Sequence, residues 1–164
     1  MKRRKVGKIC CVGFYFRKSS YYIGTFDYEI AGITNYPSNH IGFISGSGYL
    51  PEESEQILIR HFFNKTKTIP TKVVKVYEEQ KNDGTKQYFY LVLETSYPFS
   101  YNKFRDQDWN EMVVSLHNLK RFAENLNVEK HGRAFAHALR EMGERDSIFK
   151  KDNLELIQSF SKYL

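Results

Sequence analysis

The chain has 164 residues, of which 41% are hydrophobic and 16% aromatic, so its length and composition exclude two large domains and a disordered chain. It carries 25 Lys and Arg against 19 Asp and Glu, and this net charge of +6 favours anionic partners. No apolar stretch approaches the ~20 residues that cross a bilayer, which excludes a membrane-spanning helix. The only cysteines, Cys10 and Cys11, are adjacent, so we expect no disulfide and no cysteine metal site, and a location in the cytoplasm, or in the nucleus if the host has one.

The first 18 residues contain seven cations and no acid. The cations that we single out here are Lys2, Arg3, Arg4, Lys5, Arg17 and Lys18. A basic segment of this kind can grip phosphates as an arm. The apolar pattern from 6 to 16, the polar link 17–20 and the apolar residues 21–24 together predict a β-hairpin.

A short apolar run from Ile41 to Ile44 predicts a second strand region, and Gly46-Ser47-Gly48 follows it. Pro51 is expected to open the next helix at its first turn, followed by three glutamates near the positive end of the helix dipole. The buried face of that helix is expected to consist of Ile57, Leu58, His61 and Phe62. A Gly-x-Gly between strand and helix either lets backbone N–H groups approach an anion or allows tight packing, and both alternatives stay open.

The segment from Lys72 to Thr95 predicts a second hairpin, because two strands rich in β-branched and aromatic residues flank Asn82-Asp83-Gly84. An exposed edge of this hairpin could pair across a two-fold axis, so a homodimer is possible.

The remaining chain has helical spacing of its apolar residues, first from Trp109 to Leu126 and then from Phe135 to Met142. Asp152 and Glu155 predict a capping box at the start of a last helix. The expected fold class is therefore α+β, with an antiparallel sheet core and one packed helix, followed by a C-terminal three-helix segment. We expect residues 1–101 to form the mixed core with its basic arm and residues 102–164 the helical tail, in one compact unit.

The tail has an arrangement typical of a helix-turn-helix unit, with one helix ending near Leu126 and a second that Gly143 would close. Arg133, His137 and Arg140 would lie along one side of the second helix. The first functional hypothesis is therefore a small basic nucleic-acid-binding protein of viral or mobile-element origin, with these three residues and the N-terminal cations as its phosphate contacts. The type of nucleic acid stays open. Alternatively, surface aromatic residues bind an acidic host protein.

A third hypothesis rests on residues 9–63. The motifs Tyr22-Ile23-Gly24-Thr25-Phe26-Asp27 and His40-Ile41-Gly42-Phe43-Ile44, followed by Gly46-Ser47-Gly48 and a helix, look like the N-terminal half of proteasome-type N-terminal-nucleophile hydrolases. The resemblance implies Cys11 as a nucleophile freed by self-cleavage and Asp27 as its supporting carboxylate. Gly32 stands where that family carries an activating lysine, so the resemblance implies either a degenerate fold or an enzyme that uses Cys11. No complete catalytic signature or metal-ligand spacing is visible elsewhere, and a binding protein without cofactor or metal is favoured over an enzyme.

Overall fold

The structure is a computed structural model of the whole chain, and it describes residues 7–19, 27–36, 38–106 and 108–164. Its strands are β1 (Lys8–Lys18), β2 (Tyr28–Asn35), β3 (His40–Gly42), β4 (Ile44–Tyr49), β5 (Pro70–Gln80), β6 (Lys86–Thr95), β7 (Asn102–Arg105) and β8 (Glu111–Asn118). The helices are α1 (Ser54–Thr66), α2 (Leu119–Glu124), α3 (Val128–Arg145), α4 (Ser147–Asp152) and α5 (Leu154–Phe160), and a 3-10 turn spans Ser161–Tyr163. None of the described helices is both long and apolar enough to cross a membrane.

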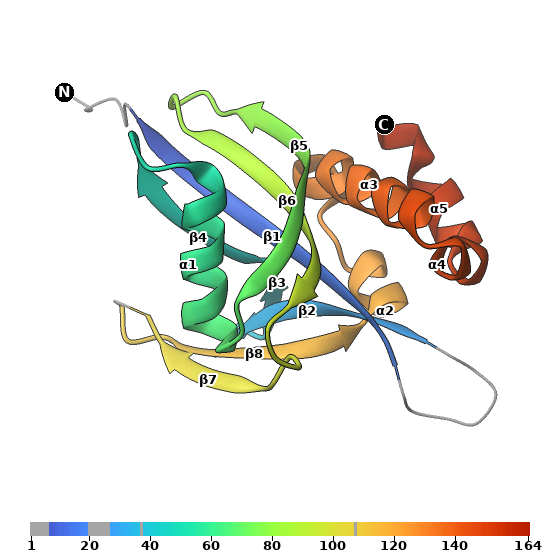
Figure 1. Cartoon of the computed structure of the whole chain (residues 1–164), viewed down its shortest axis with the longest axis horizontal. Coiled ribbons are helices and arrows are strands. Elements are labelled where there is room, and N and C mark those ends of the chain that lie inside the picture. Colours follow the sequence, from blue (N-terminus) through green and yellow to red (C-terminus); the bar gives the residue numbers. More distant parts are fainter. Residues whose placement is uncertain (1–6, 20–26, 37, 107) are drawn as a thin grey trace.

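The strands form one mixed sheet in the order β5-β6-β1-β2-β8-β7, with β3 paired to β2 and β4 paired to β1. All described pairings are antiparallel except that of β1 with β6. The predicted α+β class is confirmed, as is a C-terminal three-helix segment, which corresponds to α3, α4 and α5 (Figure 1).

Strand β1 explains how helices cover both faces of the sheet, because its side chains alternate. Phe14 and Phe16 point to the face that α3 covers, where both rings lie close to Phe135. Ile9 and Cys11 point to the opposite face and pack with α1. Both faces are apolar along this strand, which is why the sequence of β1 reads as a continuous hydrophobic run. Figure 1 shows α1 and α3 on either side of β1 and β6.

Helix α1 buries Ile57, Leu58 and Phe62, as its spacing predicted, whereas His61, the fourth residue of the predicted buried face, is only partly buried. A Cβ on Gly13 of β1 would lie 3.0 Å from Leu58 and 3.2 Å from Phe62, so this glycine lets the helix approach the sheet closely. The predicted helix start at Pro51 is wrong. The Leu50–Pro51 peptide is cis and lies in a turn, and the helix begins at Ser54.

Helix α3 buries Phe135 and Leu139 completely. The helix continues through the predicted stop at Gly143, which is buried because Ile157 packs against it, 3.3 Å from where a Cβ would stand. The predicted capping box is also wrong, because Asp152 is the last residue of α4 and the last helix, α5, starts after Asn153 without a side-chain cap. The side-chain cap nearby belongs to α4, where Asp146 accepts hydrogen bonds from Ile148 N and Phe149 N.

The helix predicted from Trp109 onward is wrong over its first half, because residues 111–118 form β8. This strand pairs with β2 on one side and β7 on the other, and Val113 and Val114 are buried. Tertiary pairing of a β-branched segment overrides the helical spacing. Strands β7 and β8 thus join the same sheet as β1 although they lie beyond residue 101, and the division of the chain at that residue stays a prediction.

The hairpin of β5 and β6 is confirmed. Its turn contains Gly84 with a φ of 87°, and Asp83 accepts a hydrogen bond from Thr85 N. β5 lies at one end of the strand order, so it offers the exposed edge that the homodimer prediction needs. The other predicted hairpin strand, residues 21–24, lies outside the described residues.

Candidate functional site

Gly46 and Gly48 lie inside β4, not in a loop before the helix. A Cβ on Gly46 would lie 1.9 Å from Cγ of His61, and one on Gly48 would lie 2.7 Å from Oε1 of Glu52. Each glycine therefore makes room for a side chain from α1 or from the turn before it. This settles the two alternatives for the Gly-x-Gly in favour of tight packing.

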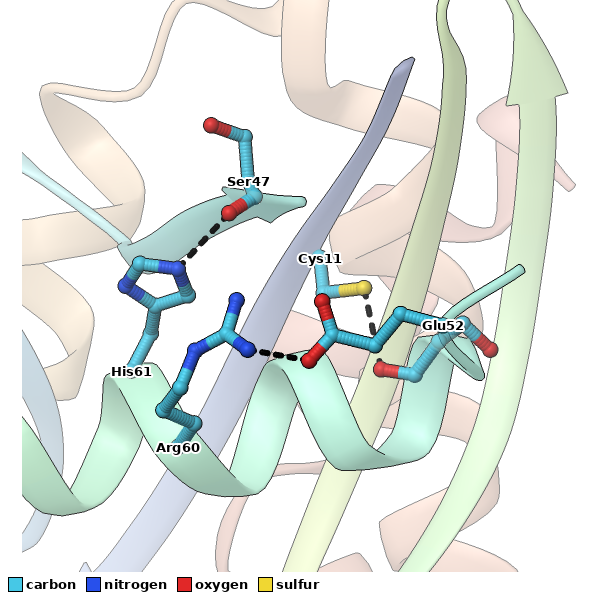
Figure 2. A network of polar contacts seen from close by, with 6 residues as sticks. Cys11, Ser47, Glu52, Arg60 and His61 are labelled. Atoms are coloured by element: carbon cyan, nitrogen blue, oxygen red, sulfur yellow. Dashed lines mark hydrogen bonds and ion pairs between the residues drawn. The ribbon is translucent and has the colours of Figure 1, made fainter. Parts of the chain in front are cut away.

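Three polar contacts connect α1 with its surroundings on this face, and Figure 2 shows the first two. Glu52 forms an ion pair with Arg60, and His61 Nε2 donates a hydrogen bond to the carbonyl oxygen of Ser47 at 2.8 Å. One turn further along α1, Lys65 Nζ donates to the carbonyl oxygen of Ser45. Burial lowers the pKa of His61, although its hydrogen bond to Ser47 opposes the shift, and burial also lowers the pKa of Lys65.

The structure does not bring Cys11 and Asp27 together. Cys11 Sγ is fully buried and donates to the carbonyl oxygen of Ser54 at 3.1 Å (Figure 2). Burial, and then the charges of Cys10 and Glu52, raise the pKa of Cys11 to about 12, so its reactive thiolate is absent at neutral pH. Asp27 is exposed and directly precedes Tyr28, which pairs with Lys18 of β1. Lys18 is seven residues from Cys11 along the same strand, a distance of roughly 23 Å.

The cations predicted to bind phosphates are spread over the chain. Lys2, Arg3, Arg4 and Lys5 lie outside the described residues. Arg17 lies 3.4 Å from Glu29 in an ion pair, and Lys18 is the last residue of β1.

Arg133 and Arg140 are exposed on α3, and His137 lies between them in sequence. The ring of His137 stacks on Tyr77 at 5.0 Å, and its Nδ1 accepts a hydrogen bond from Arg140 Nη2 at 3.0 Å. Burial and the two arginines lower the pKa of His137. The structure therefore places these three residues along one side of α3, while the opposite side packs into the core.

A pocket of about 950 Å³ lies where β3, the end of β8, α2 and the start of α3 meet. Its polar wall includes three of the five histidines, two cations and several asparagines. The histidines and cations of the lining are His40, His117, His131, Arg121 and Lys130. None of the lining residues that the structure describes is an Asp or Glu, although acids make up 19 of the 164 residues.

Two side-chain caps hold the cations at the rim of the pocket. The Asn118 side chain accepts from the backbone N–H of Arg121 at 3.1 Å at the start of α2, and the Asn127 side chain accepts from that of Lys130 at 3.3 Å at the start of α3. Arg121 and Lys130 are both exposed, and neither forms an ion pair with any carboxylate that the structure describes. Their charges are thus available to an anion.

The floor of the pocket is aromatic. The rings of Phe43 and Phe122 lie 5.2 Å apart, and the His131 ring meets Phe43 edge-on at 5.3 Å. His117 Nε2 lies 3.1 Å from Ser115 Oγ. Burial lowers the pKa of both His117 and His131, which favours their neutral rings near pH 7.

Sequence reasoning missed this pocket. The histidines have no metal-ligand spacing that would group them, and nothing in the sequence distinguishes Arg121 and Lys130 from the other cations. The local signal was the pair of caps Asn118 and Asn127, which marks two helix starts close together. Nothing in the sequence places residues 39–43 beside them.

Comparison with known proteins finds no matching family model and no similar curated protein. Solved structures do match. NrtR of Shewanella oneidensis superposes with a TM-score of 0.58 at 14% identity, over 84% of this chain and 64% of NrtR, so the chain spans less than two thirds of that protein. A mutT/nudix family protein of Listeria innocua gives 0.54 at 10% identity over 87% of this chain and 98% of that one. A MutT studied from Aliivibrio salmonicida and Vibrio cholerae gives 0.51 at 12% identity over 92% and 98%.

These likenesses correct the predictions about identity. The resemblance to proteasome-type hydrolases is wrong, because the matching structures have another hydrolase fold and because Cys11 and Asp27 lie far apart. The functional prediction of a viral or mobile-element nucleic-acid-binding protein, with its acidic-partner alternative, is also wrong. It rested on net charge and on a helix pair whose second member, α3, packs against the sheet. At 10–14% identity the comparison establishes the fold alone: this chain has the fold of the Nudix hydrolases.

Proposed function

We propose that the pocket between β3, β8, α2 and α3 binds a small anionic molecule that carries a planar ring, of the nucleoside-phosphate class. The observation that carries the proposal is the composition of the lining, which combines Arg121 and Lys130 with an aromatic floor and contains no carboxylate. The volume of about 950 Å³ lies within the range of small-molecule sites.

Each part of the pocket matches one part of such a ligand. The guanidinium of Arg121 offers paired N–H donors that fit phosphate oxygens, and Lys130 adds a second positive charge. Phe43, which is half-buried, offers an apolar face for a ring.

Calorimetric titration in EDTA with ADP, AMP, adenosine and inorganic diphosphate tests the proposal without any metal. We expect ADP to bind most tightly, because only ADP combines the ring with two phosphates. Arg121→Gln and Lys130→Gln should each weaken ADP binding about ten- to a hundredfold, the equivalent of one lost charge-assisted contact. Lys120→Gln is the matched control, since Lys120 is an exposed cation of α2 outside the lining.

Two results would refute the proposal: no saturable ADP binding by the wild-type protein, or equal weakening by Lys120→Gln. The anionic ligand could also be part of a nucleic acid, with Arg133 and Arg140 as further predicted contacts. A short oligonucleotide in the same titration tests this alternative. The cytoplasmic location also remains a proposal, which the free thiols of Cys10 and Cys11 support.

A further inference from the structure

The Nudix hydrolase fold implies a divalent cation as its resident cofactor, so the residues of this chain can be tested for a fit. Mg²⁺ prefers carboxylates and other oxygen ligands, usually with two or more of them from the protein or substrate. Among the residues that the structure describes, no three His, Cys, Asp or Glu side chains lie close enough together to hold a metal ion, so they form no all-protein cage. A site completed by substrate phosphates would still need one or two free carboxylates, which makes the charges around Glu52 decisive.

The charges on the face between α1 and β4 oppose a cation directly. α1 directs His61 and the positively charged Lys65 toward β4, and the guanidinium of Arg60 adds a second positive charge beside Glu52. The carboxylate in this cluster, Glu52, is already paired with Arg60 (Figure 2). A divalent cation here would have to displace Arg60 and approach two like charges.

The same side chains have a structural partner. β4 pairs with β1 along one edge, and no second strand pairs with it among the described residues. The carbonyl oxygens of Ser45 and Ser47 are two residues apart in β4, and the side chains of His61 and Lys65 are four residues apart on α1. Residues two apart on a strand and four apart on a helix face the same way, so the two donors meet the two acceptors in register.

We propose that His61 and Lys65 form a structural clamp between α1 and β4 that closes the edge strand, that Arg60 occupies Glu52, and that the chain binds no divalent cation there. The inference is independent of the proposed pocket ligand, because it rests on other residues and its test contains no nucleotide. It assigns the clamp residues to holding β4 and to satisfying the edge carbonyls that would otherwise be unpaired.

Thermal unfolding with and without Mn²⁺, together with Mn²⁺ titration by electron paramagnetic resonance, tests both parts. We expect the Tm of the wild type to be unchanged by Mn²⁺, or to change equally in Glu52→Gln. Glu55→Gln is the control, since Glu55 is exposed on the first turn of α1. Saturable Mn²⁺ binding that is lost in Glu52→Gln and kept in Glu55→Gln would overturn the proposal.

Lys65→Met tests the clamp itself by keeping an unbranched side chain, one heavy atom shorter, and removing its donor. Its Tm should fall further than that of Lys151→Met, a control at an exposed lysine of α4. Equal Tm values for the two variants would overturn the structural role of Lys65. If Lys65→Met does not fold at all, the Mn²⁺ titration of wild type and Glu52→Gln still decides whether this face holds a cation.

Discussion

Replacing Gly46 by alanine gives the sharpest test of the packing between β4 and α1. The added methyl carbon would stand 1.9 Å from Cγ, 2.3 Å from Cδ2 and 2.5 Å from Cβ of His61, so the imidazole ring must move. Moving it breaks the hydrogen bond to Ser47, worth about 1 kcal/mol, and overpacking of this kind costs about 1–3 kcal/mol. We expect the free energy of unfolding to fall by about 2–4 kcal/mol in Gly46→Ala.

Gly42→Ala is the matched control, because a Cβ there has no heavy atom within 4 Å and its neighbours need not move. Urea unfolding followed by circular dichroism is the suitable assay, since Trp109 is 77% exposed and its fluorescence would report weakly on burial. Gly46→Ala should also be measured in a His61→Gly background, where both the ring and the Cβ that stand in the way are gone. The added loss should then shrink to that of the control, which is a coupling between neighbouring residues. Equal stability of Gly46→Ala and Gly42→Ala, or simple additivity with His61→Gly, would refute the reasoning.

Three further expectations concern other parts of the molecule. Burial raises the pKa of Cys11 to about 12, so an aromatic disulfide reagent at about pH 8 should modify only Cys10 in the native protein and both cysteines in urea. Intact-mass analysis counts the adducts, and two rapid adducts on the native protein would contradict this expectation. Asp146→Ala should lose about 1 kcal/mol of stability in urea unfolding, whereas Asp152→Ala should stay within about 0.5 kcal/mol; the reverse order would restore the predicted capping box. Burial lowers the pKa of His117 below 6.5. The contribution of the neutral ring to the free energy of unfolding is therefore present above pH 6.5 and is lost as the pH falls through the folded pKa. His117→Gln should reduce the loss of stability between roughly pH 7 and pH 5, and an unchanged loss would contradict the assignment.

The parts of the fold that could be predicted from sequence are those with local rules. The turn at Asn82-Asp83-Gly84 requires a positive φ, which Gly84 supplies, and the two strands beside it have the expected composition. The buried stripes of α1 and α3 follow helical spacing. The face of each side chain in β5 could not be predicted, because the strand is irregular. The register of β5 against β6 shifts between Lys75 and Tyr77, so simple alternation fails to give the face of each side chain.

The segment around Val113 shows why local spacing was insufficient. Val113 and Leu116 fit a helix, but the segment forms β8 because β2 and β7 offer it pairing on both edges. Pairing across about 80 residues of chain is invisible in a local pattern. The same limit applies to the pocket, whose walls combine residues 39–43 with residues 116–131. Each wall looks like an ordinary turn until the sheet brings β3 and β8 to the two sides of β2.

The pocket and the clamp can vary independently within one fold, because different residues build them on different elements. The pocket depends on β3, β8 and the starts of α2 and α3, and its anion-favouring charge comes from Arg121 and Lys130. The clamp depends on α1 and β4, where Lys65 and His61 satisfy strand carbonyls. The titrations in EDTA and with Mn²⁺ therefore have four distinguishable combined outcomes. ADP binding without Mn²⁺ binding at Glu52 would support both proposals: the pocket binds an anionic ligand, and the face between α1 and β4 is structural. Mn²⁺ binding at Glu52 without ADP binding would refute both proposals.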